Sequence, residues 1–364
     1  MIIYIDNTID KHEKTHGFLL EERRMFANIA FAHWKGICFL CGDDMSIKCL
    51  AHKLPDYYVG INKRHAELGV LFDLVETVIV ISYEKEPKLL KKLQGKARII
   101  TVDEAKEYNL GEKCCLLGEN YTDCNFYKLI AERYKALLPG KMRSLNITLQ
   151  NKLGGGGTSH TVFEECVMTD KKLTLCLADS DIKYDVTKKY PDLRKGGTVK
   201  KLLGVNNHPS LKPYKQIFDF YELPVHEAEN LIPISVLRDI SENEHIFTMR
   251  PGIKCLRKLY KKKLFRAILF YDFKKGANQL KGDPAYEYWY QIGTRIGDCD
   301  FPPICADILE KSIAYLSELD SNGCQRIETV NLDCYLVPLW NIIGRKVFSW
   351  GFAYKPSPTN PPRP

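Results

Sequence analysis

Residues 173–181 read LTLCLADSD, an apolar run that ends in two acids. A short continuous apolar run of this kind is typical of a strand buried on both faces of a parallel sheet. Asp179 and Asp181 follow it with the period-two spacing of an extended chain, which directs both carboxylates to one side. The segment therefore predicts an α/β fold with a pair of acids at the end of a buried strand.

Two further acidic signals follow short apolar segments elsewhere in the chain. Glu119 comes after the run CCLL (114–117), and Asp123 lies four residues further on. Glu227 and Glu229 lie in PVHEAENLIP (224–233). Because ligands of parallel α/β sheets gather at the carboxyl ends of strands, we expect these acids to converge although they are remote in sequence.

The simplest alternative is that each acid is structural. An Asp that follows a strand is, taken alone, more often a helix N-cap or a turn residue than a ligand. Capping alone does not readily produce the whole ordered set of strand–Glu, glycine run, strand–Asp-x-Asp and Glu-x-Glu-Asn. Several converging carboxylates would raise each other's pKa unless a hard divalent cation neutralised them. The pattern thus predicts a site for Mg²⁺ or Mn²⁺, suited to phosphodiester chemistry.

The chain of 364 residues is longer than a typical single domain, and its patterns suggest four parts. Residues 1–110 alternate strand-like and helix-like runs and predict a small α/β domain with a mostly parallel sheet, assigned by elimination to sensing or docking. Residues 111–280 predict the catalytic α/β domain. A mainly helical region covers 281–355, with helices near 285–293 and 304–319, and 356–364 form a flexible tail. One strand is expected at 267–273, AILFYDF.

Positive charge is concentrated in one stretch. The whole chain has a net charge of +8, but residues 248–281 hold eleven Lys or Arg residues and a single acid, Asp272. Such a stretch is either the solvated face of an amphipathic helix or a contact for phosphate backbones. The nucleic-acid-binding candidates are Arg257, Lys258, Lys261, Lys262 and Lys263.

Composition suggests a cytoplasmic protein with no membrane partner. The N-terminus lacks the basic and apolar regions of a secretory signal, and no apolar run is long enough to span a bilayer. The thirteen cysteines are expected to be reduced core residues. Cys38, Cys41, Cys49 and His52 have zinc-like spacing, but the apolar run ICFLC favours a strand over a zinc knuckle. The run Gly154–Gly157 lacks the Lys-Ser/Thr of a phosphate loop, and is either a turn beside the acidic crevice or a linker.

Residues 113–276 resemble the Toprim domain, in particular the branch found in overcoming-lysogenization-defect (OLD)-like nucleases and related anti-phage effectors. Gly118-Glu119 with Asp123, and Asp179-Ser180-Asp181, match its two acidic strand ends. HEAEN (226–230) resembles the trailing glutamate motif, and FKKG (273–276) resembles a lysine-containing strand of some members. The order Gly-Glu-Asn departs from the usual hydrophobic-Glu-Gly.

The resemblance implies a Toprim-like, mostly parallel sheet flanked by helices and a metal-dependent nuclease, the effector of an anti-phage or abortive-infection system. The implied metal ligands are Glu119, Asp123, Asp179, Asp181 and Glu229. Glu119 would ligate a metal or act as general base, and Lys274 would stabilise charge on phosphate or be a plain surface lysine. Glu229 is preferred to Glu227 because it adjoins Asn230.

The target would be DNA or RNA. No Walker-type phosphate loop occurs in the sequence, so an ATPase or sensor protein would act in trans, and an oligomer is possible. Two alternatives remain: a primase or topoisomerase-type Toprim enzyme, and a non-catalytic binding subunit of a larger nucleic-acid-associated complex.

Overall fold

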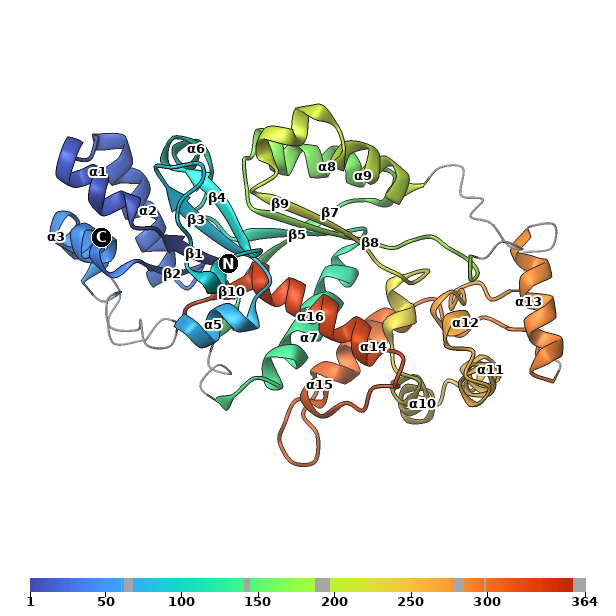
Figure 1. Cartoon of the computed structure of the whole chain (residues 1–364). Coiled ribbons are helices and arrows are strands. Elements are labelled where there is room, and N and C mark those ends of the chain that lie inside the picture. Colours follow the sequence, from blue (N-terminus) through green and yellow to red (C-terminus); the bar gives the residue numbers. More distant parts are fainter. Residues whose placement is uncertain are drawn as a thin grey trace.

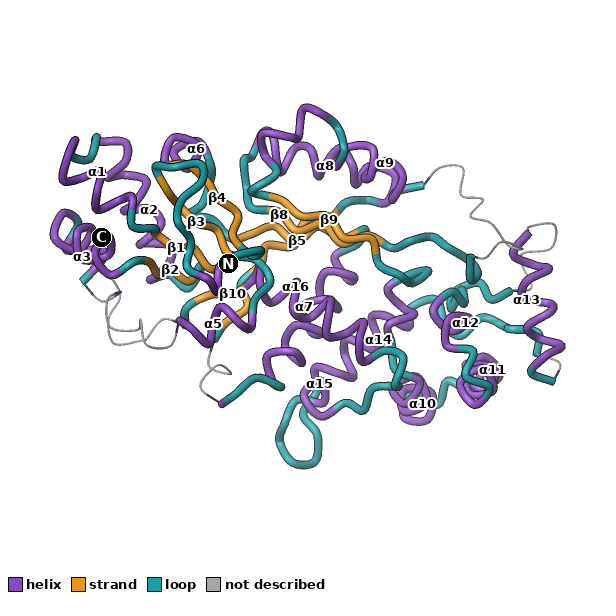
Figure 2. Tube along the Cα trace, viewed as in Figure 1, coloured by secondary structure: helices purple, strands orange, loops and turns teal. Residues whose placement is uncertain are grey.

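The computed structural model describes residues 1–59, 61, 68–140, 145–186, 197–277, 284–297 and 299–355. The tail expected at 356–364 lies outside these residues. The fold is mixed α/β, with parallel sheets flanked by helices (Figures 1 and 2). No helix in the described part of the chain is long and apolar enough to cross a membrane.

The first sheet is parallel and has the strand order β2-β1-β3-β4. Its strands are β1 (Ile2–Ile5), β2 (Phe39–Gly42), β3 (Val78–Ser82) and β4 (Ala97–Thr101). All residues of β1, β2 and β3 are buried, which explains their uninterrupted apolar sequences. The helices of this part are α1 (Thr8–His16), α2 (Leu20–Trp34), α3 (Asp44–Lys53), α4 (Pro55–Tyr58), α5 (Leu68–Leu74) and α6 (Val102–Glu107).

The second sheet is also parallel and has the order β7-β5-β8-β9. In both sheets the second strand along the chain lies at one edge beside the first, and the third and fourth strands follow on the other side of the first. Its strands are β5 (Cys114–Gly118), β7 (Leu149–Leu153), β8 (Thr174–Ala178) and β9 (Phe218–Glu222). The edge strand β9 was missed in the sequence because FDFYE mixes acids with aromatic residues. β5 and β8, which carry the predicted acids, are adjacent central strands.

Helices leave the second sheet toward opposite faces. After β5 the chain forms α7 (Tyr121–Ala136), which packs with α16 (Val337–Gly351) on one face. The helices α8 (Ser159–Glu164) and α9 (Thr198–Asn206) lie on the other face (Figure 1). The carboxyl ends of β5 and β8 therefore form the topological switch point, where open α/β sheets bind ligands.

The C-terminal region returns to the body of the molecule. β10 (Phe352–Ala353) pairs antiparallel with β6 (Asn146–Ile147), and the terminal amine of Met1 donates to the carbonyl of Phe352. The buried apolar side chains of both sheets and of α16 form one continuous core. The other helices of this region are α10 (Ile234–Asn243), α11 (Arg250–Lys261), α12 (Phe265–Leu269), α13 (Pro284–Arg295), α14 (Ile308–Ser317) and α15 (Arg326–Thr329).

The strand expected at 267–273 is wrong: the segment forms the end of α12 and a turn. Its carbonyl groups are satisfied without a neighbouring strand, since the Asn230 amide donates to the carbonyls of Ile268 and Tyr271. The backbone N–H of His226 donates to the carbonyl of Leu269. The backbone carbonyls of this buried apolar segment thus accept hydrogen bonds from an asparagine side chain and from the backbone of a crossing loop.

The expectation of reduced cysteines is also wrong for one pair. Cys255, in α11, forms a disulfide with Cys299, whereas the other eleven cysteines are free thiols. Cys41 lies in β2, which confirms the strand predicted around it. The disulfide encloses the segment that carries Asp272 and Lys274.

Candidate metal centre at the carboxyl ends of β5 and β8

Glu119 and Asp179 lie at the switch point of the second sheet. Each follows its strand directly, and the register pairs Leu117 of β5 with Cys176 of β8, so the two strands end nearly level. The acids are 60 residues apart in sequence, yet the charge of Glu119 raises the pKa of Asp179. The predicted convergence of strand ends thus brings these two acids into one crevice.

The glycine run supports the backbone at Glu119. The N–H of Gly154 donates to the carbonyl of Gly118 at 2.9 Å, and the N–H of Gly155 donates to the carbonyl of Glu119 at 2.9 Å. A Cβ atom on Gly154 would lie 2.7 Å from the Gly118 carbonyl oxygen. Of the two interpretations of this run, the structure therefore agrees with a turn packed beside the acidic crevice.

Asp179 is held from two sides. The Tyr127 hydroxyl donates to its Oδ1 at 3.2 Å, and the N–H of Ala228 donates to its Oδ2 at 3.2 Å. Only 7% of the residue is exposed. Burial, and then the charges of Asp123 and Glu119, raise the pKa of Asp179 well above its usual range.

Asp181 reaches the same crevice by a different backbone path from the one expected. Its φ of 57° is in the left-handed region, so the extended spacing from Asp179 is wrong at this residue. The N–H of Asp181 donates to the carbonyl of His226 at 3.2 Å, which links β8 to the loop after β9. Asp181 still contributes to raising the pKa of Glu119. A strained, non-glycine backbone of this kind is common at functional sites.

Asp123 combines the structural and the functional interpretation. It is the third residue of α7, and its Oδ2 accepts the backbone N–H of Asn120 at 2.9 Å in a capping box. Burial, followed by repulsion from Glu229 and Glu119, outweighs that hydrogen bond and raises the pKa of Asp123 to about 7. Asp123 therefore caps α7 and also lies close enough to other acids to be repelled by their charges.

Lys274 lies between the two trailing glutamates. Its Nζ is 2.9 Å from Oε1 of Glu229 and 3.2 Å from Oε2 of Glu227. Burial opposes its charge, but the two carboxylates outweigh burial and raise the pKa of Lys274. Both glutamates therefore contact Lys274. The contact of Glu229, the glutamate preferred from the sequence, is only 0.3 Å shorter than the contact of Glu227.

The cluster has the electrostatics of a cation site. Burial is the main cause that raises the pKa of Glu119 and of Glu229, and neighbouring acids add to it. Oε1 of Glu119 is buried without a hydrogen-bond partner among the described residues. Buried like charges that raise each other's pKa favour a hard cation, and these oxygen donors fit Mg²⁺ or Mn²⁺.

The acids do not form a closed cage. Among the described residues, only His226, Glu227 and Asp272 place three potential ligand atoms within 4.8 Å of one another. Magnesium commonly keeps several waters and uses one or two protein carboxylates, so an open arrangement is compatible with it. One electrostatic cluster includes Glu119, Asp123, Asp179, Asp181 and Glu229.

Sequence reasoning missed several residues of this region. Tyr127 and Thr198 hydrogen-bond Asp179 and Glu119, respectively, and nothing in their surrounding sequence marks them. For His226 and Asp272 a signal was available: His226 precedes Glu227 in the motif, and Asp272 is the single acid within the basic stretch.

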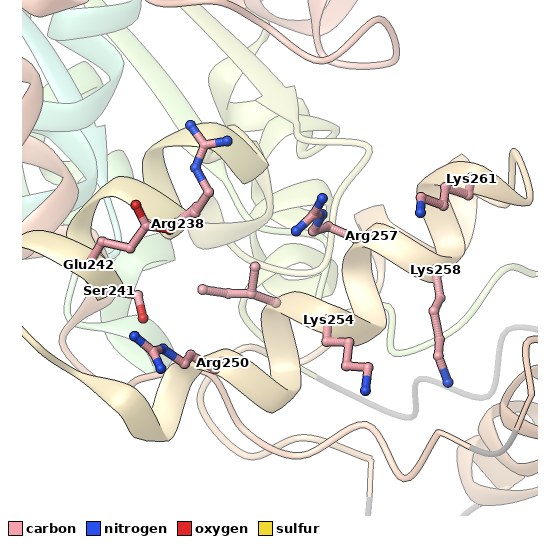
Figure 3. A pocket seen from close by; sticks show the side chains of 9 residues that line it. Arg238, Ser241, Glu242, Arg250, Lys254, Arg257, Lys258 and Lys261 are labelled. Carbon is pink, nitrogen blue, oxygen red and sulfur yellow. The ribbon is translucent and has the colours of Figure 1, made fainter.

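The basic stretch forms a groove between α10 and α11. The groove has a volume of about 620 Å³, and Figure 3 shows its cationic side chains along both helices. Arg257, Lys258 and Lys261 line it, whereas Lys262 and Lys263 do not. Sequence reasoning missed its other cations, Arg238, Arg250 and Lys254. Leu256 and Leu259 are buried on the opposite side of α11, as an amphipathic helix requires.

Comparison of the chain with protein-family models, with curated proteins and with solved structures gave no match.

Proposed function

We propose that this protein is a divalent-metal-dependent nuclease of the Toprim type. The observation that carries the proposal is the convergence of Glu119, Asp179 and Asp181 at the switch point of the second sheet, where burial and mutual repulsion raise the pKa values of Glu119 and Asp179. Acids held this close suit cation-assisted phosphoryl chemistry. The order of strand–Glu, strand–Asp-x-Asp and trailing glutamates, in a parallel sheet, supports the Toprim assignment.

In this proposal each side chain has a separate task. A bound Mg²⁺ or Mn²⁺ would polarise the phosphate and lower the pKa of a bound water. Asp179, fixed by Tyr127 and Ala228, and Asp181 would orient it. Glu119, whose pKa burial and the charge of Asp181 raise, would serve as ligand or general base. The Lys274 ammonium would stabilise negative charge on the phosphate.

The groove between α10 and α11 would hold the nucleic-acid backbone. Six of its lining side chains are cationic and one, Glu242, is acidic. Guanidinium and ammonium groups in a row bind phosphates without reading sequence, so this groove would position DNA or RNA rather than select a site.

The test uses plasmid, linear DNA and tRNA as substrates, each with Mg²⁺, Mn²⁺ or EDTA. We expect the purified chain to cut at least one of them in the presence of metal, and Asp179→Ala to abolish cutting. Asp103→Asn is the matched control, because the Asp103 side chain is 88% exposed and its ion pair is with Lys106 of the same helix, α6. Cutting that survives in EDTA or in Asp179→Ala would contradict the proposal.

A second candidate is a non-catalytic binding subunit. The observation in its favour is that Lys274 already neutralises part of the charge of Glu227 and Glu229 without a metal. Nucleic-acid binding that is equal in the wild type and in Asp179→Ala, with no cutting in either, would support it. A primase or topoisomerase activity would instead appear in the same assays as primer synthesis or plasmid relaxation.

The resemblance also supports a role as an anti-phage effector that an ATPase or sensor protein restrains or directs in trans. Expression of the chain with its neighbouring genes in a bacterial host should reduce phage plaque formation. Asp179→Ala should restore plaques, whereas Asp103→Asn should not.

A further inference from the structure

His226 is a buried histidine whose hydrogen-bonding capacity is unused. Only 3% of the residue is exposed, and neither Nδ1 nor Nε2 has a hydrogen-bond partner within the described structure. A buried polar group left unsatisfied destabilises the folded protein, so such a group calls for an explanation. A bound ligand that occupies a ring nitrogen would provide one.

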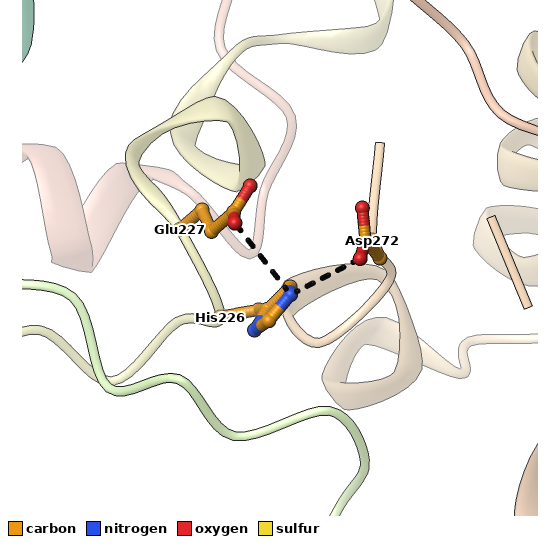
Figure 4. Close-up of side chains that lie close together, drawn as sticks. All are labelled: His226, Glu227 and Asp272. Carbon is orange, nitrogen blue, oxygen red and sulfur yellow. Dashed lines mark ion pairs between the residues drawn. The ribbon is translucent and has the colours of Figure 1, made fainter. Parts of the chain in front are cut away.

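Two carboxylates face the ring of His226 (Figure 4). Nε2 is 3.7 Å from Oδ2 of Asp272 and 3.9 Å from Oε1 of Glu227. The three potential ligand atoms all lie within 4.8 Å of one another. Ligand atoms around a tetrahedral metal with bonds near 2.0–2.1 Å are about 3.4 Å apart. To hold an ion, the distances between the three ligand atoms therefore need to shorten, by amounts between several tenths of an ångström and about an ångström.

The carboxylate of Asp272 is oriented by the backbone. Its Oδ1 accepts the N–H groups of Lys274 at 3.0 Å and Lys275 at 2.7 Å, which leaves Oδ2 directed at His226. The backbone of His226 is fixed at both ends by hydrogen bonds to Leu269 and Asp181. Hydrogen bonds that orient ligands in this way are typical of built metal sites.

We propose that His226, Glu227 and Asp272 form a second metal site, selective for a first-row transition ion such as Zn²⁺, Mn²⁺ or Co²⁺. One imidazole and two carboxylates suit these ions, whereas Mg²⁺ and Ca²⁺ prefer oxygen ligands alone. Three protein ligands leave a position open for water, as in catalytic rather than structural zinc sites. The proposal goes beyond the nuclease assignment and does not require it.

The geometry also connects this site to the acidic cluster. Glu227 turns Oε1 toward His226 and Oε2 toward Lys274, and Lys274 in turn contacts Glu229. An ion bound at His226 would compete with Lys274 for Glu227. The ammonium would then pair with Glu229 alone, which gives the transition ion a route to influence the neighbouring centre.

The experiment is a Co²⁺ titration followed by visible absorption, in the presence of excess Mg²⁺. We expect the wild type to bind one Co²⁺ with a visible band, His226→Gln to weaken that binding by about 100-fold, and Asp179→Asn to retain it. Circular dichroism verifies that each variant is folded. Binding that is unchanged in His226→Gln, or that is lost in Asp179→Asn, would overturn the proposal.

A second measurement avoids substitutions. Pulsed EPR of Mn²⁺ bound to the wild-type protein in excess Mg²⁺ should show coupling to an imidazole nitrogen. Coupling to water and carboxylate groups alone would overturn the proposal even if His226→Gln failed to fold. Neither readout depends on cleavage, so failure of this site and failure of the nuclease proposal are distinguishable.

Discussion

The two sheets have the same strand order, yet their switch points differ in chemistry. Asp6 follows β1 directly, as Glu119 follows β5, and Tyr83 follows β3, as Asp179 follows β8. In the first sheet Oδ1 of Asp6 accepts from the N–H and the hydroxyl of Thr8, and Oδ2 is buried without a hydrogen-bond partner in the described part of the chain. In the second sheet burial raises the pKa values of Glu119 and Asp179 first, and the charges of several neighbouring acids raise them further. The strand order creates a crevice, but only like charges at both strand ends make it a candidate metal centre.

Other acids near the first switch point also have local tasks. Asp43 caps α3 through the N–H groups of Met45 and Ser46, and Asp10 pairs with Lys14 at 2.7 Å. These are the capping roles that acids after strands most often have. That residues 1–110 lack a catalytic site remains a prediction. Three experiments test the difference between the acids at the two switch points.

The largest expected effect is on cleavage. Glu119→Gln should lower metal-dependent cleavage by at least about 100-fold, because it removes the carboxylate charge that would bind the cation or accept the proton of water. Asp6→Asn, at the equivalent position of the first sheet, should leave cleavage unchanged. Rates are measured with the same substrate and metal for both variants, after their folding has been checked. Equal losses of cleavage in the two folded variants would contradict the proposed difference between the two switch points.

The next effect concerns stability and its dependence on pH. The pKa of Asp123 is raised to about 7 in the folded protein, so between about pH 4 and pH 7 the folded state binds more protons than the unfolded state. Without metal, stability should therefore fall as pH rises through this window, with Asp123 contributing on the order of 4 kcal/mol. Added Mg²⁺ should reverse part of the loss at about pH 8, because it binds the ionised acids.

Urea unfolding in EDTA or in Mg²⁺ measures this effect. Asp123→Asn keeps an acceptor for the Asn120 N–H and should flatten the fall with pH, whereas the exposed Asp103→Asn should not. A wild-type protein whose stability rises steadily over the window without metal would contradict the account of the cluster.

The smallest effect concerns the basic groove. Arg257→Ala should weaken nucleic-acid binding by about 1 kcal/mol and reduce the slope of log affinity against log salt by about one. Lys92→Ala is the control, since Lys92 lies beside the first sheet and is 53% exposed. Fluorescence anisotropy at several salt concentrations gives both quantities. Equal effects of the two substitutions would indicate diffuse attraction to net charge rather than a groove.

The sequence predicted what depends on local pattern. The runs that form β1, β3, β5 and β8 are fully buried, so their apolar character was readable, and the acids that follow β5 and β8 were visible for the same reason. The shared strand order was not readable, because it depends on which strand edges pair. The segment 267–273 was mistaken for a strand because its backbone partner is the side chain of Asn230, far away in sequence.

The same limit applies to the site. Motif and position predicted a site made of Glu119, Asp123, Asp179, Asp181, Glu229 and Lys274. Their roles remain a prediction, and the structure places them in one electrostatic cluster. The trio of His226, Glu227 and Asp272 was not found, since Asp272 reaches His226 only because α12 replaces the expected strand and a turn follows it.

The most direct test of the central claim is anomalous diffraction from crystals soaked in Mn²⁺. The account predicts an anomalous peak between Glu119 and the Asp179–Asp181 pair at the carboxyl ends of β5 and β8. A soaked crystal with no peak there, and with these carboxylates pointing away from one another, would contradict it.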